Sequence, residues 1–144
     1  MTIGEKKISK FYIGQSSSIE RTFTERDVKS YMELTREENS VYSDDVFMKK
    51  VQLKGRVVPG LLSEGLIMEV SSKELPGSPG LLLQKELIYH HPVYIGDNIT
   101  AKVEIIDIDL RRRWITLMVQ CTNQLGEVVI TGQIVALVII NTSE

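Results

Sequence analysis

The chain has 144 residues, of which 42% are hydrophobic and 25% are charged, and its formal net charge is −2. These values are typical of one soluble globular domain, which we expect to span residues 1–144. A charge so close to zero gives no electrostatic basis for binding nucleic acid or an anionic membrane surface.

Cysteine content and hydropathy set further bounds. The single cysteine, Cys121, excludes an intramolecular disulfide and a zinc cluster built from cysteines. We expect neither a metal nor a cofactor. The longest apolar run, 134–140, is too short to cross a bilayer. Residues 1–7 are charged and lack the apolar segment of a secretory signal, so the expected compartment is the cytoplasm.

The first third of the chain alternates between short elements. Residues 1–16 are expected to be an extended lead-in, and 18–23 alternate as a strand does. Thr24 is a candidate N-cap, and acidic residues follow it in the first turn of a helix that should reach about residue 36. Residues 37–43 are expected to form a loop, and a short helical turn capped by Asp44 or Asp45 follows.

The next segment predicts the central element of the fold. After a loop at 51–58, residues 60–73 form a helical segment whose apolar side chains point nearly all round the axis. That pattern is typical of a buried helix. Pro59 favours a helix start, and the amide of Gly60 is left free to bind a partially negative oxygen.

The remaining sequence is strand-like. The turn signal at 76–80 is followed by four expected strands, with turns between them at 93–97, 110–113 and 123–126. The expected strands lie at 81–89, 98–108, 114–122 and 127–140. Consecutive strands joined by short turns should pair antiparallel. The sequence therefore predicts an α+β domain with one antiparallel sheet packed on one long helix.

This arrangement resembles the hot-dog fold, in which an antiparallel sheet wraps around a long central helix. Residues 92–97, Pro-Val-Tyr-Ile-Gly-Asp, resemble the segment after the first long strand of MaoC-like dehydratases, the family of (R)-specific enoyl-CoA hydratases. Residues 122–129 resemble the last hairpin of that family. The similarity spans roughly residues 20–140. It implies a homodimer or higher homo-oligomer with the active site at the subunit interface.

The catalytic motif of the family, Ser/Thr-Gly-Asp-x-Asn-Pro-x-His, falls on residues 35–42. Thr35 and Asn39 match it, whereas Glu37 stands at the Asp position and Tyr42 at the His position. In the family, the Asp and His activate a water that adds to the β-carbon of an enoyl thioester. The resemblance therefore implies Glu37 as a general base and Tyr42 as a hydrogen-bond donor. A tyrosine, with an ordinary pKa of about 10, is a poor base near neutral pH.

A second family element, Ala-His-Gly-Met/Leu-Leu, falls on residues 58–62, with Pro59 in place of the His. The family's Gly amide helps to bind the thioester oxygen, and Gly60 preserves it. The resemblance thus implies a hydratase or dehydratase of acyl-CoA or acyl-carrier-protein thioesters. Its catalytic residues would be Glu37 and Tyr42, and its substrate-binding residues Asn39, Gly60 and Leu61.

Two other functions stay open. The substituted motif is compatible with a non-catalytic acyl-CoA-binding module or the partner subunit of an active enzyme. Glu64, in the first turn of the apolar helix, could instead serve a thioesterase. Each candidate site residue could instead have an ordinary structural role. Glu37 would be a solvated carboxylate, Tyr42 a packing residue, Asn39 a loop brace, and Glu64 a charge favoured by the helix dipole at a subunit interface.

Two further groups of titratable side chains complete the candidates. His90 and His91 are adjacent on an expected strand, so they should point to opposite faces and not share a site. The arginines at 111–113 are expected in a solvated turn, with the phosphates of coenzyme A as an alternative partner.

Overall fold

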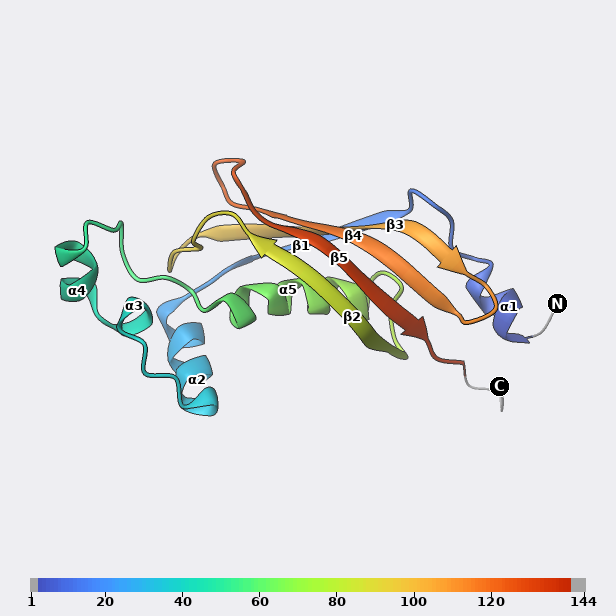
Figure 1. Ribbon diagram of the computed structural model, residues 1–144, viewed down its shortest axis with the longest axis horizontal. Helices are drawn as coiled ribbons and strands as arrows, with labels where there is room; N and C mark the ends of the chain where they lie inside the picture. The colour runs from blue at the N-terminus through green and yellow to red at the C-terminus, as the bar shows by residue number, and fades with distance from the viewer. Residues whose placement is uncertain (1–2, 141–144) are drawn as a thin grey trace.

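The computed structural model of the chain describes residues 3–140. Helices and strands in this part of the chain gather into one curved sheet, one long helix inside its curve and small helices at the ends (Figure 1). The elements are α1 (Ile3–Ile8), β1 (Ser16–Thr22), α2 (Glu25–Thr35), α3 (Ser40–Ser43), α4 (Asp45–Lys50), α5 (Gly60–Lys73), β2 (Gly80–Tyr89), β3 (Asn98–Asp109), β4 (Trp114–Thr122) and β5 (Val128–Val138).

The sheet is antiparallel throughout, with the strand order β1-β3-β4-β5-β2. Among the four strands after α5, each is expected to pair with the next one along the chain. This is confirmed for β3 with β4 and for β4 with β5, but it is wrong for β2 and β3, because β2 pairs with β5. The segment between these two strands is not a hairpin. It pairs with other parts of the chain, since Val58 N–H donates to Val93 O at 2.7 Å and Gly96 N–H donates to Phe23 O at 2.7 Å. Strand β2 therefore forms the opposite edge of the sheet, next to β5.

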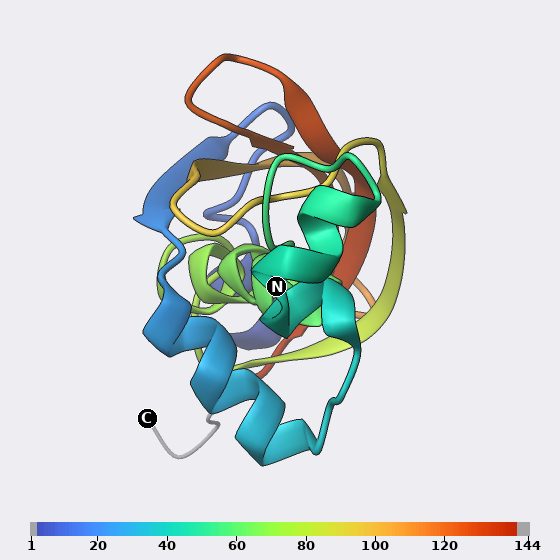
Figure 2. The same ribbon diagram turned by 90° about the vertical axis from the view of Figure 1, so that its left-hand side faces the viewer.

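Helix α5 lies in the concave side of this sheet, and the sheet curves around it when seen end-on (Figure 2). Leu66, Ile67 and Val70 are almost fully buried, as are the alternating inward side chains of β3. The apolar alternation on β3 thus places one face against the helix, where burial of apolar surface stabilises both elements. The predicted α+β arrangement of a hot-dog fold, with a buried central helix, is confirmed.

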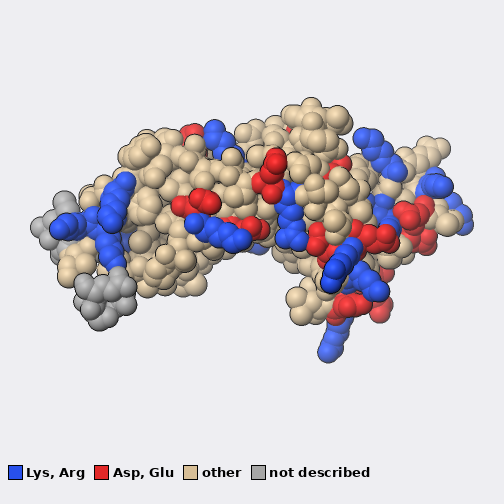
Figure 3. All heavy atoms as spheres, turned by 180° about the vertical axis from the view of Figure 1, so that it is seen from behind, with Lys and Arg blue, Asp and Glu red and all other residues tan. Residues whose placement is uncertain are grey.

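Local helix signals in the first third of the chain also hold. Thr24 caps α2 in a reciprocal capping box with Asp27, and Asp44 accepts from Phe47 N–H at the start of α4. These caps satisfy amides that the first helical turn leaves unpaired. The small helices α2, α3 and α4 gather at one end of the molecule, where charged side chains are densest (Figure 3).

Two expectations for the same region are wrong. The lead-in at 1–16 is expected to be extended, but its described residues begin with helix α1. This helix forms because Ile8 is fully buried in the core. The expected loop at 37–43 contains the one-turn helix α3, whose N-cap Asn39 accepts a hydrogen bond from Val41 N–H at 3.2 Å. Within residues 3–140, no helix is long and apolar enough to cross a membrane.

Candidate active site

A pocket of ≈ 390 Å³ opens at the amino end of α5. Tyr42 of α3 forms one wall, and Gly60 and Ser63 of the first turn of α5 form another. Residues 89–93, from the end of β2 and the segment after it, close the opposite side. The pocket therefore exists because β2 ends next to the start of the central helix.

Gly60 brings a free backbone donor into this pocket. Its predecessor Pro59 accepts from Leu62 N–H at 3.0 Å and from Ser63 N–H at 3.1 Å, which begins the helix. Among residues 3–140, nothing accepts a hydrogen bond from the amide of Gly60. An unpaired amide at a helix N-terminus favours a partially negative oxygen. The absence of a side chain also matters here, because a Cβ on Gly60 would lie 3.0 Å from Cε1 of Tyr89.

Tyr42 separates this pocket from a neighbouring one of ≈ 320 Å³ that is lined by α2, Glu37 and Arg56. Burial raises the pKa of the Tyr42 hydroxyl, and the charge of Glu37 raises it further. The structure thus brings Glu37 and Tyr42 together, and Tyr42 and Gly60 together. Glu37 itself borders the second pocket only.

The two other predicted binding residues lie outside these walls. Asn39 is exposed and caps α3, in agreement with the structural role considered above. Leu61 is 59% exposed beside the helix start and faces neither pocket. It is the one apolar side chain of α5 that is exposed, and it therefore contradicts an all-round buried helix.

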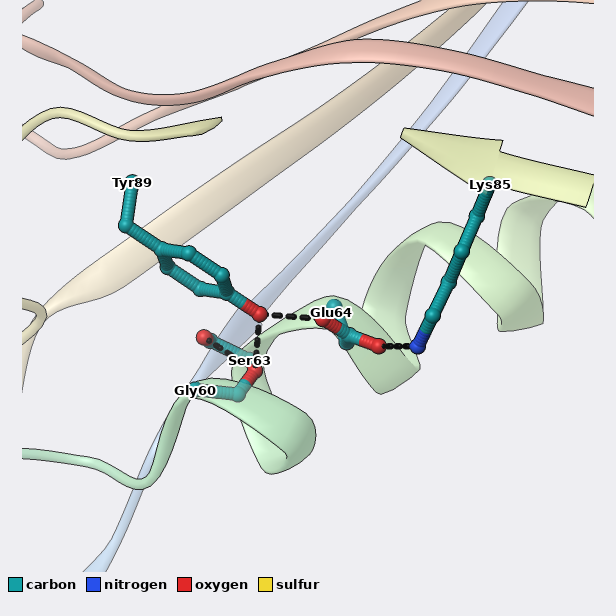
Figure 4. Close-up of polar contacts among 5 residues, drawn as sticks. All are labelled: Gly60, Ser63, Glu64, Lys85 and Tyr89. Carbon is teal, nitrogen blue, oxygen red and sulfur yellow. Dashed lines mark hydrogen bonds and ion pairs between the residues drawn. The ribbon is translucent and has the colours of Figure 1, made fainter. Parts of the chain in front are cut away.

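A polar cluster next to Gly60 was only partly visible in the sequence (Figure 4). Glu64 is only 7% exposed, forms an ion pair with Lys85 and accepts a hydrogen bond from the hydroxyl of Tyr89. Tyr89 Oη also lies 3.1 Å from the carbonyl oxygen of Gly60. The signal that sequence reasoning missed is the spacing of Lys85 and Tyr89, which places both on one face of a strand.

Both histidines border the main pocket, directly after β2 ends at Tyr89. The expectation that their side chains point to opposite faces stays a prediction. His90 Nε2 lies 2.6 Å from Thr131 Oγ1 of β5. Among residues 3–140, no group of three or more His, Cys, Asp or Glu side chains could hold a metal ion.

The arginines at 111–113 occupy an exposed turn between β3 and β4, as expected. The guanidinium of Arg112 lies over the Trp114 ring, 4.9 Å from its centroid. This turn lies at the end of the sheet that is remote from the amino end of α5 (Figure 1).

An antiparallel sheet wrapped around one helix, with a free amide and a pocket at the helix N-terminus, defines a hot-dog protein with a site suited to an oxyanion. Residues 12–125 match the MaoC like domain, and the chain belongs to that family.

Known relatives are hydratases and dehydratases. The chain is 30% identical over 125 residues to an (R)-specific enoyl-CoA hydratase of Rhodospirillum rubrum, covering 87% of this chain and 86% of the relative. It is 31% identical over 127 residues to the mitochondrial 3-hydroxyacyl-(acyl-carrier-protein) dehydratase FERN of Solanum lycopersicum, and the match covers 87% of this chain and 76% of the relative. The solved (R)-hydratase from A. caviae superposes with a TM-score of 0.86 at 25% identity, covering 90% of this chain and 98% of that one.

Proposed function

We propose that this chain is an acyl-thioester hydro-lyase, which adds water to or removes it from the β-carbon of an acyl-CoA or acyl-carrier-protein thioester. The observation that carries the proposal is the unpaired Gly60 amide in a pocket that Tyr42 also lines. The relatives named above act on both kinds of carrier, which supports the reaction type and leaves the choice of carrier to experiment.

In this proposal, the Gly60 amide holds the thioester oxygen, which gains negative charge as the enolate forms. The oxygen of water bonds to the β-carbon, and one of its protons passes to Glu37, whose side chain must turn past Tyr42 from the neighbouring pocket to accept it. The electron pair of the alkene forms a double bond between the α-carbon and the carbonyl carbon, and the carbonyl pair moves to the thioester oxygen. The enolate then takes a proton at the α-carbon from the protonated Glu37, which restores the carboxylate and the thioester carbonyl. Tyr42 stays protonated because its pKa is raised, and it donates a hydrogen bond to the water or to the thioester. Asn39 and the exposed Leu61 would contact the carrier arm outside the pocket.

The test is the hydration of crotonyl-CoA by the purified protein, followed by the loss of absorbance of the enoyl thioester. Glu37→Ala should lower kcat by about a hundredfold or more, since general acid–base groups contribute about that much. Glu38→Ala, the same change at the exposed neighbouring residue, is the matched control and should leave the rate unchanged. Equal rates for the two variants would remove Glu37 from the mechanism, and a background rate for the unmodified protein would remove the activity.

A non-catalytic binding module, or the partner subunit of an active enzyme, is the second candidate. It is favoured by the Tyr42 hydroxyl, which is too weak a base to replace a histidine. This function predicts saturable binding of acyl-CoA in calorimetry without turnover. The thioesterase alternative stays a prediction, and release of free thiol from acyl-CoA that Glu64→Gln abolishes would support it.

We also propose that the chain forms a homodimer through the free edge of β2. This strand ends the sheet and exposes Leu81, Leu83 and Ile88, and uncovered apolar edge strands favour pairing with another chain. Ile88→Lys should shift the mass measured by light scattering from dimer to monomer. Leu34→Lys, on the exposed face of α2, should not. A monomeric unmodified protein would refute the proposal.

A further inference from the structure

A chain of three side chains, outside the positions of the family motif, ends in the main pocket. Lys85 of β2 pairs with Glu64 of α5, and Glu64 accepts a hydrogen bond from Tyr89. Tyr89 lines the pocket together with Gly60 and is 46% exposed, whereas the carboxylate behind it is nearly buried (Figure 4). The cluster therefore connects a buried charge to a hydroxyl that a ligand can reach.

The position of the hydroxyl proton follows from the neighbours of Tyr89. Burial, and then the hydrogen bond to Glu64, raise the pKa of the hydroxyl, so it keeps its single proton. Both protein groups within hydrogen-bond distance, the Glu64 carboxylate and the Gly60 carbonyl, are acceptors only. A charged acceptor forms the stronger hydrogen bond, so Glu64 holds the proton. The lone pairs of Tyr89 Oη are then left for a donor in the pocket.

We infer that Tyr89 accepts a hydrogen bond from the water that adds to the β-carbon, or from the β-hydroxyl group in the reverse direction. Glu64 and Lys85 are positioning residues that fix the direction of the Tyr89 hydroxyl. The inference rests on the proposed hydro-lyase activity. One proton of the water is held by Tyr89, which orients the attacking oxygen, and the other passes to a base. Glu37 can be that base only if its side chain turns past Tyr42 from the neighbouring pocket. Tyr89 neither gains nor loses a proton.

Removal of the acceptor is the first test. Tyr89→Phe keeps the ring against Gly60 and removes only the hydroxyl oxygen. We expect kcat for crotonyl-CoA hydration to fall about tenfold, which corresponds to one hydrogen bond to the reacting water, with KM unchanged. Tyr12→Phe makes the same chemical change at an exposed residue outside the pocket and should leave both constants as they are.

The second test reverses the direction of the hydrogen bond. In Glu64→Gln, the Lys85 ammonium can only donate, so it attracts the amide oxygen and turns the amide N–H towards Tyr89 Oη. That N–H occupies one lone pair of Tyr89 Oη and turns the hydroxyl proton away from residue 64, towards the Gly60 carbonyl and the pocket. The water then meets a donor where it needs an acceptor, and kcat should fall by about the same factor as in Tyr89→Phe. Adding Lys85→Met frees the amide oxygen to accept from Tyr89, so the double variant should recover kcat towards the unmodified value.

These outcomes separate the inference from the proposed function. An inactive unmodified protein would overturn both. An active protein in which Tyr89→Phe retains its kcat, or in which the double variant is no faster than Glu64→Gln, would overturn the inference alone. A loss in Glu64→Gln that appears only as a lower melting temperature, with kcat per folded enzyme intact, would assign the cluster to stability and also overturn it. Circular dichroism of each variant measures the folded fraction.

Discussion

Gly132 on β5 is expected to be the most sensitive glycine for the placement of β2. Its φ is +155°, and a Cβ built on it would lie 2.0 Å from the carbonyl oxygen of Glu86 on β2. Carbon–oxygen contacts between strands normally lie at about 3.3 Å or more, so Gly132→Ala must separate the strands by about 1 Å. Breaking about two ladder hydrogen bonds costs about 2 kcal/mol, and the strained backbone adds about 1–3 kcal/mol.

Gly132→Ala should therefore lower the free energy of unfolding by about 3–5 kcal/mol, and the melting temperature by about 10–15 °C. Urea denaturation and thermal melts measure both. Gly126→Ala is the matched control, because Gly126 also has a positive φ of +79° but has no atom within 4 Å of an added Cβ. It should lose only about 1–2 kcal/mol from backbone strain. Equal losses in the two variants would show that the contact between β5 and β2 is not the cause.

Three further predictions concern stability. Gly65→Ala, at an exposed helix position with space for a Cβ, should raise the free energy of unfolding by about 0.5–1 kcal/mol, and a lower urea midpoint would contradict this. The Thr24 backbone amide is the main cause that lowers the pKa of Asp27, so the stability that this carboxylate contributes is lost as the pH falls below about 4. Asp27→Asn should flatten that acid slope in urea titrations between pH 2 and 5, and an unchanged slope would exclude the cap as its source. Burial raises the pKa of the Cys121 thiol to about 12, so between pH 9 and 12 only the unfolded chain releases this proton and stability falls as the pH rises. Cys121→Ala should reduce that decline, and equal declines in the two proteins would refute the assignment.

Local sequence patterns determined most of the elements of this fold. The alternation of Ile99, Ala101 and Val103 gave the inward face of β3, and Thr24 marked the start of α2 correctly. These features depend on neighbours a few residues apart, which strand alternation and capping express directly. The resemblance across residues 20–140 pointed to the family because many such local signals agree with one fold.

The sequence did not predict two helices, α1 and α3. Burial stabilises the first and a side-chain cap the second, although neither segment has a helical hydrophobic period. The first residues lack a strong helical period, yet α1 forms because Ile8 is fully buried in the core. Helix α3 has one turn, too short to give a periodic signal, and Asn39 stabilises it as a cap. For the site, Tyr42 and Gly60 border one pocket and Glu37 borders the neighbouring one, and the roles assigned to all three stay predictions.

The sequence by itself determined a buried helix with a free amino end and an antiparallel sheet around it. Only the tertiary structure decided that β2 pairs with β5, and therefore that Lys85 and Tyr89 meet Glu64. These contacts join residues 21 and 25 positions apart along the chain. No local period specifies which edge of a sheet a strand occupies. That choice follows from the packing of the whole sheet around α5, which sets the direction of the Tyr89 hydroxyl beside Gly60.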